Sequence, residues 1–241
     1  MRHHGVPPPL FADPAMTSEN PAADATADAG PAPLTTIQAR ILGCLIEKEA
    51  TTPEAYPLTA NAVVLACNQK TSREPLMELE PGEVGHALRE LEGLGAIRSV
   101  HGARAQRYEH RFAQAWSVTT RQQALLCVLM LRGPQTLAEL HTRCERIAAF
   151  ADLDEVRLTL ERLAQRTPAL ALNLGRGAGQ REDRYMHLLS GAVDAEQLLA
   201  SVKSTGSAER SGGETPSRID ALEAAVAALR AELDALKSRL P

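Results

Sequence analysis

The sequence has few aromatic residues: among 241 residues there are three Phe, three Tyr and one Trp, which is 3% of the chain. A platform that stacks the bases of single-stranded nucleic acid needs several aromatic side chains, and ligand pockets are also rich in them. An excess of positive charge is absent too, since 26 Lys and Arg stand against 30 Asp and Glu, a formal net charge of −4. Binding of nucleic acid by the chain as a whole is therefore disfavoured, and any such binding must be local.

Long apolar runs and closely paired cysteines are also missing. The longest uninterrupted apolar run, Ala124 to Leu131, has eight residues, whereas a membrane-spanning helix needs about 20. The first residues, Met1 to Pro9, lack the apolar stretch of a secretory signal. The cysteines form no C-x-x-C motif, so we expect small buried thiols rather than disulfides or metal ligands at Cys44, Cys67, Cys127 and Cys144. These absences predict a cytoplasmic protein without a metal site.

The middle of the chain contains an internal repeat. Arg107-Tyr108-x-His110 returns 77 residues later as Arg184-Tyr185-x-His187, and Glu83-Val84 returns 72 residues later as Glu155-Val156. A period of this length is too long for a solenoid unit. We therefore expect two copies of one small domain.

Both copies show the same order of elements, three helices followed by a two-stranded hairpin. Apolar spacing and Pro and Gly positions place the first copy's helices over 36–48, 59–67 and 81–94, and its strands over 97–100 and 106–112. The second copy's helices are expected over 120–131, 137–146 and 152–165, and its strands over 170–174 and 184–189. This is the order of a winged helix-turn-helix domain. We predict a mainly α chain with small β-hairpins (α+β), with tandem winged helix-turn-helix domains over 34–115 and 116–191.

Helix starts carry capping patterns that support these boundaries. Thr35 precedes Gln38 by three residues, and Thr120 precedes Gln123 by three, the spacing of a capping box. Asp152 has the same spacing to Glu155. We expect these residues to begin the first helix of each copy and the third helix of the second.

The two ends of the chain lie outside the repeat. Residues 1–33 are rich in Pro and Ala, which predicts a disordered tail, and residues 192–217 read as a flexible linker. From 218 to 241, apolar residues alternate at spacings of three and four, at Ile219, Leu222, Val226, Leu229, Leu233, Leu236 and Leu240. This heptad pattern favours a parallel two-stranded coiled coil and hence a homodimer. The alternative is one amphipathic helix packed on its own chain, since three heptads alone are marginal.

Several segments within residues 34 to 191 carry a resemblance to a known family. They are Leu45–Glu54 (LIEKEATTPE), Tyr56–Thr59 (YPLT), Ala66–Lys70 (ACNQK), Ser72–Pro75 (SREP), Tyr108–Phe112 (YEHRF), Leu129–Thr136 (LMLRGPQT) and Arg184–Leu188 (RYMHL). Together they resemble the YceH-like family of uncharacterised bacterial proteins. The resemblance implies a tandem winged-helix fold and no established activity. Ala138 and His141 depart from the family pattern, which has Gly and Arg there.

A basic cluster in the first hairpin is the candidate nucleic-acid site. It consists of Arg98, Arg104, Arg107 and Arg111, accompanied by His101 and His110 and by a single acid, Glu109. Arginines on a wing can follow phosphates or enter a minor groove. The preceding helix argues against this, because a helix that carries Glu83, Glu90 and Glu92 is repelled by DNA. In the alternative interpretation the arginines pair with nearby carboxylates on a solvated hairpin.

The remaining motifs give no catalytic pattern. The polar runs 47–49 and 68–74 could form a binding surface, or a loop fixed by hydrogen bonds to its own backbone. The repeated Arg-Tyr-x-His motif could hold a base or a metal, but shared packing in two sister strands is the simpler explanation. Gly175-x-Gly177-x-Gly179 precedes a strand, so it offers no helix N-terminus to a phosphate. We expect no enzyme, cofactor or metal.

Two functions remain. The first is a dimeric tandem winged-helix protein that binds double-stranded DNA as a regulator, an analogy that rests on fold and on the arginine-rich wing. The alternative is a protein–protein interaction module whose winged helices bind a partner protein without catalysis, which the overall acidity favours.

Overall fold

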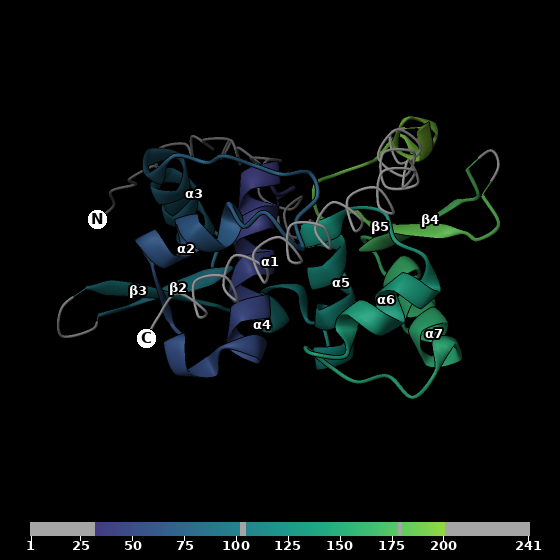
Figure 1. The fold of residues 1–241 in the computed structure, drawn as a ribbon, viewed down its shortest axis with the longest axis horizontal. Coiled ribbons are helices and arrows are strands. Elements are labelled where there is room, and N and C mark those ends of the chain that lie inside the picture. Colours follow the sequence, from purple (N-terminus) through teal and green to yellow (C-terminus); the bar gives the residue numbers. More distant parts are fainter. Residues whose placement is uncertain (1–31, 102–104, 178–179, 201–241) are drawn as a thin grey trace, which may run out of the picture. The chain divides into compact units, whose positions relative to one another are not determined.

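The computed structural model describes residues 32–101, 105–177 and 180–200 (Figure 1). These residues form seven α-helices between Thr36 and Ala164, one short 3-10 helix and five strands in two antiparallel sheets, and residues 195–200 are also helical. The predicted α+β class, mainly helical with small hairpins, is confirmed. No helix in the described ranges has both the length and the apolar character needed to span a membrane.

In the first copy, helices and strands follow the predicted order with two short additions. The elements are α1 (Thr36–Thr51), the 3-10 helix η1 (Pro53–Ala55), β1 (Leu58–Thr59), α2 (Ala60–Cys67), α3 (Pro81–Gly93), β2 (Ile97–His101) and β3 (Gln106–His110). The sequence pattern did not predict β1 and η1. A two-residue strand is too short to show alternation.

The second copy repeats this order after a connecting helix. Its elements are α5 (Thr120–Arg132), α6 (Leu137–Cys144), α7 (Leu153–Ala164), β4 (Ala171–Gly175) and β5 (Arg184–His187), with α4 (Phe112–Trp116) before them. The prediction that the strand from Gln106 extends to Phe112 is wrong. Arg111 leaves the extended conformation, with φ −122° and ψ 30°, and its carbonyl accepts hydrogen bonds from Gln114 and Ala115 in α4.

Capping boxes begin both first helices, one of them a residue earlier than predicted. At α1, Thr35 Oγ1 accepts from the Gln38 backbone N–H at 3.2 Å, and Gln38 Oε1 accepts from Thr35 N–H at 2.8 Å. At α5 the box is formed by Thr119 and Gln122 rather than by Thr120 and Gln123. Gln123 is buried among the core residues of α5, so the more exposed Gln122 completes the box. Asp152 caps α7 as predicted.

Each hairpin is held against its own copy by antiparallel pairing. The first sheet has the order β1-β3-β2, with Leu58 opposite Tyr108 and Ser99 also opposite Tyr108. The second sheet pairs β4 with β5, and an isolated bridge joins Gln135 to Tyr185. The bridge at Gln135 therefore stands where β1 stands in the first copy.

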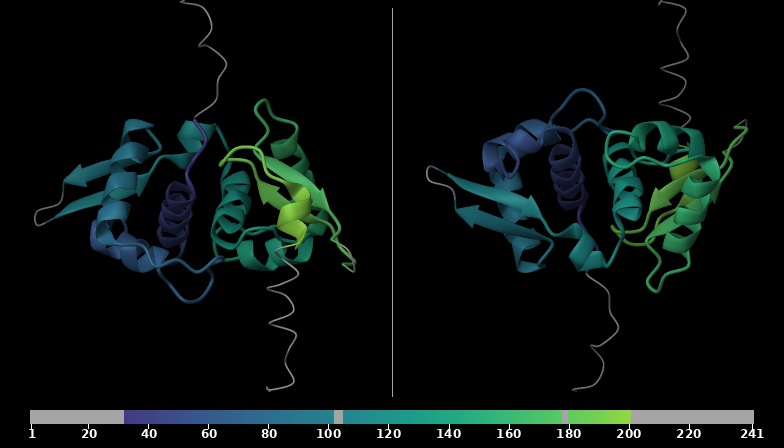
Figure 2. Two further views of the ribbon diagram at one scale, coloured as in Figure 1. Left: turned by 90° about the horizontal axis from the view of Figure 1, so that it is seen from above. Right: turned by 90° about the horizontal axis from the view of Figure 1, so that it is seen from below.

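Helices α1 and α5 lie side by side in all three views (Figures 1 and 2). The contact is close because Gly43 has no side chain: a Cβ atom there would lie 2.9 Å from Leu131 Cδ2. Beside it, Cys127 Sγ donates a hydrogen bond to the Gly43 carbonyl at 3.3 Å. All four cysteines are buried and free, as expected. One core therefore runs across both copies.

Residues 1–31 of the predicted tail, most of the predicted linker, and the predicted coiled coil lie outside the described residues. Residues 195–200, at the start of the predicted linker, are helical, and Asp194 Oδ1 accepts from the Gln197 backbone N–H at 3.0 Å. The heptad residues from Ile219 to Leu240 belong to the part of the chain that the structure does not describe.

Candidate functional site

The first hairpin places two of its predicted arginines on one face. Cross-strand register puts Arg98 opposite Glu109, and Val100 opposite Arg107, so these four side chains share a face. Arg98 Nη2 forms an ion pair with Glu109 Oε1 at 2.6 Å. Arg107 Nη1 donates to the Pro57 carbonyl at 2.7 Å, which ties the hairpin to the segment before β1.

Arg111 lies beyond the strand, and Arg104 lies outside the described residues. Arg111 is exposed at the start of α4, and its guanidinium has no hydrogen-bond or ion-pair partner within the described ranges. The hairpin therefore carries one neutralised cation, Arg98, and two cations without a carboxylate partner, Arg107 and Arg111. The ion pair of Arg98 supports the interpretation in which the arginines pair with carboxylates, and Arg107 and Arg111 remain candidates for contacts with phosphates.

The helix before the hairpin exposes mainly acidic side chains. On α3, Glu83 and Glu90 are exposed, and Glu80 stands at its N-cap. His86 Nε2 lies 3.2 Å from Glu90 Oε1, while the exposed Arg89 has no partner among the described residues. A phosphate backbone approaching this face would meet more negative than positive charge.

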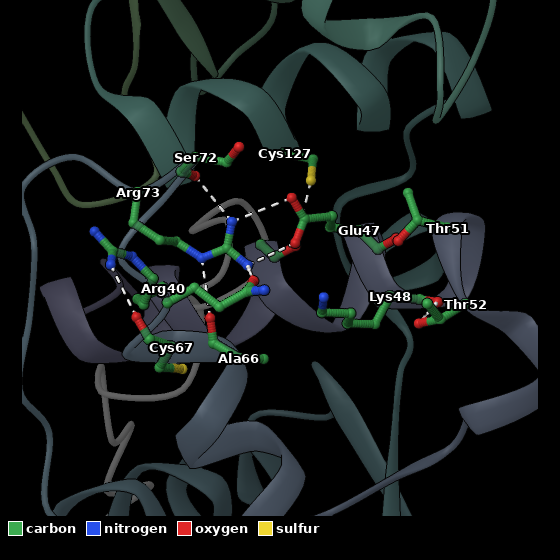
Figure 3. A network of polar contacts seen from close by, with 12 residues as sticks. Arg40, Glu47, Lys48, Thr51, Thr52, Ala66, Cys67, Ser72, Arg73 and Cys127 are labelled. Carbon is green, nitrogen blue, oxygen red and sulfur yellow. Dashed lines mark hydrogen bonds and ion pairs between the residues drawn. The ribbon is translucent and has the colours of Figure 1, made fainter. Parts of the chain in front are cut away.

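The polar run from Asn68 to Glu74 forms a loop, and the buried side chain of Arg73 anchors this loop to α1 (Figure 3). Its Arg73 side chain has an exposed fraction of 0% and points into the first copy, toward Glu47 of α1. The two side chains form a bidentate pair, with Nη1 3.1 Å from Oε1 and Nη2 2.5 Å from Oε2. Burial by itself would lower the pKa of Arg73, but the hydrogen bonding to Glu47 and the electrostatic attraction of nearby groups together outweigh it, so the pKa of Arg73 is raised.

Arg73 and Arg40 donate further hydrogen bonds that hold the same loop. Arg73 Nε donates to the Ala66 carbonyl at 3.0 Å, and Nη2 donates to Gln69 Oε1 at 2.6 Å. Arg40, also buried, donates to the carbonyls of Cys67 at 3.2 Å and Pro75 at 2.7 Å. Burial lowers the pKa of Arg40. Two guanidinium groups thus hold the connection between α2 and α3.

Side chains near both ends of this loop form hydrogen bonds with neighbouring segments. Asn68 both donates to the Leu79 carbonyl and accepts from the Leu79 N–H, each at 2.9 Å. Ser72 Oγ accepts from Arg132 Nη2 at 2.6 Å, which connects the loop to α5. The bonds of Asn68 to the Leu79 backbone agree with the fixed-loop interpretation of the run, whereas Ser72 bonds a side chain of α5 rather than the backbone.

The arginine of the repeated Arg-Tyr-x-His motif makes the same kind of hydrogen bond in both copies. Arg184 Nη1 donates to the Pro134 carbonyl at 3.0 Å, as Arg107 does to Pro57. The histidines differ: His110 Nε2 lies 2.7 Å from Glu49 Oε2, whereas His187 is buried and this burial lowers its pKa to about 4. No cluster of three or more potential metal ligands occurs in the described residues.

The most exposed apolar side chain of α7, Leu158, was not identified from the sequence. Val156, Leu160 and Leu163 form the buried face of this helix, and Leu158 is 53% exposed on another face. Leu158 lines a shallow depression between α7 and the first turn of α5, together with Ala148, Ala149 and Arg162. The sequence did contain one indication of this exposure, because Leu158 does not fit the spacing of the buried residues Val156, Leu160 and Leu163.

Comparison with known proteins identifies relatives over most of the chain. The family model described as "Protein of unknown function, DUF480" matches residues 34–180. A UPF0502 protein of Xanthomonas oryzae pv. oryzae is 55% identical over 210 residues, covering 86% of this chain and 94% of the relative. A UPF0502 protein of Stenotrophomonas maltophilia (strain K279a) is 54% identical over 206 residues, covering 85% and 94%. The family resemblance read from the sequence is confirmed, and the chain belongs to the DUF480, or UPF0502, family of uncharacterised bacterial proteins.

Proposed function

We propose that the chain is a tandem winged-helix protein whose second copy binds a partner protein. The element order of three helices and a hairpin, present twice, supports two winged-helix domains over 34–115 and 116–191. In such domains the third helix is the element that reads the major groove when the ligand is DNA. The surfaces of α3 and α7 therefore distinguish a DNA ligand from a protein ligand.

The exposed Leu158 on α7 is the observation that carries this proposal. A helix that enters the major groove presents polar and basic side chains to base edges and phosphates. α7 does expose two arginines, Arg157 and Arg162, but it also exposes the apolar Leu158, and Leu153 at its first turn. The other third helix, α3, exposes Glu83 and Glu90, which repel phosphates. An apolar side chain in a shallow depression is a better match to a protein surface.

A homodimer in the cytoplasm is part of the proposal. The heptad pattern between Ile219 and Leu240 supports two-stranded association, and dimerisation would present two copies of the α7 surface to a partner. The absence of a catalytic motif in the sequence supports a role in binding rather than in chemistry.

Site-specific photo-crosslinking tests the proposal. A benzophenone amino acid is introduced at Leu158 of the full chain, or at Arg89 on α3 as a matched exposed control, in a bacterium that carries the family such as Xanthomonas. We expect an ultraviolet-dependent, nuclease-resistant protein adduct from position 158 and none from position 89. The proposal would be contradicted if nuclease treatment removed the adducts, or if position 158 gave no adduct.

DNA binding by the first hairpin is the second candidate. It is favoured by Arg107 and Arg111, which are both exposed and have no carboxylate partner among the described residues. Contacts of this kind with phosphates would be strongly salt-dependent. The acidic surface of α3, next to β2 in sequence, opposes this candidate.

A further inference from the structure

A shallow depression of about 610 Å³ lies between two helices of the second copy. One wall is the first turn of α5, from Thr119 to Gln122, and the other is α7. Leu158 stands in this depression with Ala148 and Ala149. A depression that is this open does not enclose a small ligand, but it can receive one or two side chains of a protein segment.

The positive charge beside Leu158 is unpaired. Arg162 follows Leu158 by four residues on α7, so the two side chains lie on the same face of the helix. Arg162 is exposed and has no hydrogen-bond or ion-pair partner among the described residues.

The other two charged residues that line the depression, Arg121 of α5 and Glu155 of α7, pair with each other across it. Arg121 Nη1 pairs with Glu155 Oε1 at 2.8 Å, and Arg121 Nε also donates to the Ala149 carbonyl at 3.4 Å. The two charges of this pair cancel, so it does not offset the charge of Arg162. The N-terminal end of α5, a helix of 13 residues, adds a partial positive charge to the α5 wall. Among the charged residues that line the depression, Arg162 is therefore the one without a partner in the described residues, and it stands beside the exposed Leu158.

We infer that this depression binds an acidic amphipathic segment of a partner protein, which places an apolar side chain against Leu158 and a carboxylate against Arg162. The inference rests on the proposed function and specifies the chemistry of the partner. A basic segment would be repelled by Arg162, and a wholly polar one would leave Leu158 in water.

Fluorescence anisotropy with two designed probes tests the inference. The first probe is a labelled 18-residue helical peptide of Leu, Ala and Glu, and the second has every Glu replaced by Lys. The full chain is expected to bind the acidic probe in a saturable manner and to bind the basic probe weakly. Arg162→Glu should weaken binding of the acidic probe by about tenfold or more and should strengthen binding of the basic probe.

Two further variants separate the site from the fold and from net charge. Leu158→Asp should abolish binding of the acidic probe while circular dichroism remains unchanged, because the side chain is exposed. Arg89→Glu makes the same charge change on α3 and should bind like the wild type.

Three results would overturn the inference. These are no saturable binding of the acidic probe, equal binding of both probes, or self-association of the full chain that Leu158→Asp removes, which would make the occupant a second copy. If the probes fail while position 158 still crosslinks to a protein, the proposed function stands and only the acidic chemistry of the partner is wrong.

Discussion

Replacing Glu47 by Ala is expected to lower the free energy of unfolding by about 3–5 kcal/mol, because it leaves a buried guanidinium without its carboxylate. The Arg73 side chain has no exposed surface and forms a bidentate pair with Glu47. Urea denaturation followed by circular dichroism measures the loss. The same change should release the loop from Asn68 to Glu80, which hydrogen exchange detects as faster exchange there.

Companion variants show that the loss comes from the unpaired charge. Arg73→Met combined with Glu47→Gln should recover part of the stability, since removing both charges leaves no ion unpaired. Lys70→Ala breaks the exposed pair with Glu78 and should leave the denaturation midpoint unchanged. Equal stabilities of Glu47→Ala and Lys70→Ala would show that the buried pair of Glu47 and Arg73 contributes nothing to the free energy of unfolding.

The stability of the protein is expected to fall by about 3 kcal/mol as the pH drops from 6.5 to 4, through His187 alone. Burial lowers the pKa of His187 from 6.5 to about 4. Its Nδ1 has no hydrogen-bond partner within the described ranges. Between these two pH values the unfolded chain binds the proton and the folded chain does not. The stabilisation is therefore complete above pH 6.5, declines as the pH falls, and is lost at pH 4.

Replacing His187 by Gln removes this titration. The free energy of unfolding of His187→Gln, measured by urea denaturation at several pH values, should change less steeply between pH 6.5 and 4 than that of the wild type. His101→Gln, an exposed histidine at the end of β2, is the control and should keep the wild-type pH dependence. Parallel curves for His187→Gln and the wild type would contradict the assignment to His187.

The sequence was sufficient to predict the regular elements, because their signals are local. Apolar spacing placed α1, α3, α5 and α7, and the Thr35–Gln38 box marked the start of α1. The strand β1 and the helix α4 were missed because they have two and five residues, too few for a periodic pattern. The shift of the α5 box from Thr120 to Thr119 depends on which Gln is buried, a property of tertiary packing.

The candidate site could be predicted only in part, because its properties depend on pairing. The sequence places Arg98, Arg107 and Arg111 close together, but only the register shows that Arg98 pairs with Glu109. The pair between Glu47 and Arg73 joins residues 26 positions apart, and its burial follows from the path of the loop. The exposure of Leu158 likewise depends on what α5 and α7 leave uncovered.

Titration of the full chain with mixed-sequence duplex DNA over a salt series tests most directly the claim that this protein binds a partner protein rather than DNA. We predict no saturable binding at low salt and no difference between the wild type and the combined Arg107→Glu and Arg111→Glu variant. An affinity that falls steeply as salt rises, with a slope that this variant makes shallower, would contradict the account and assign DNA to the first hairpin.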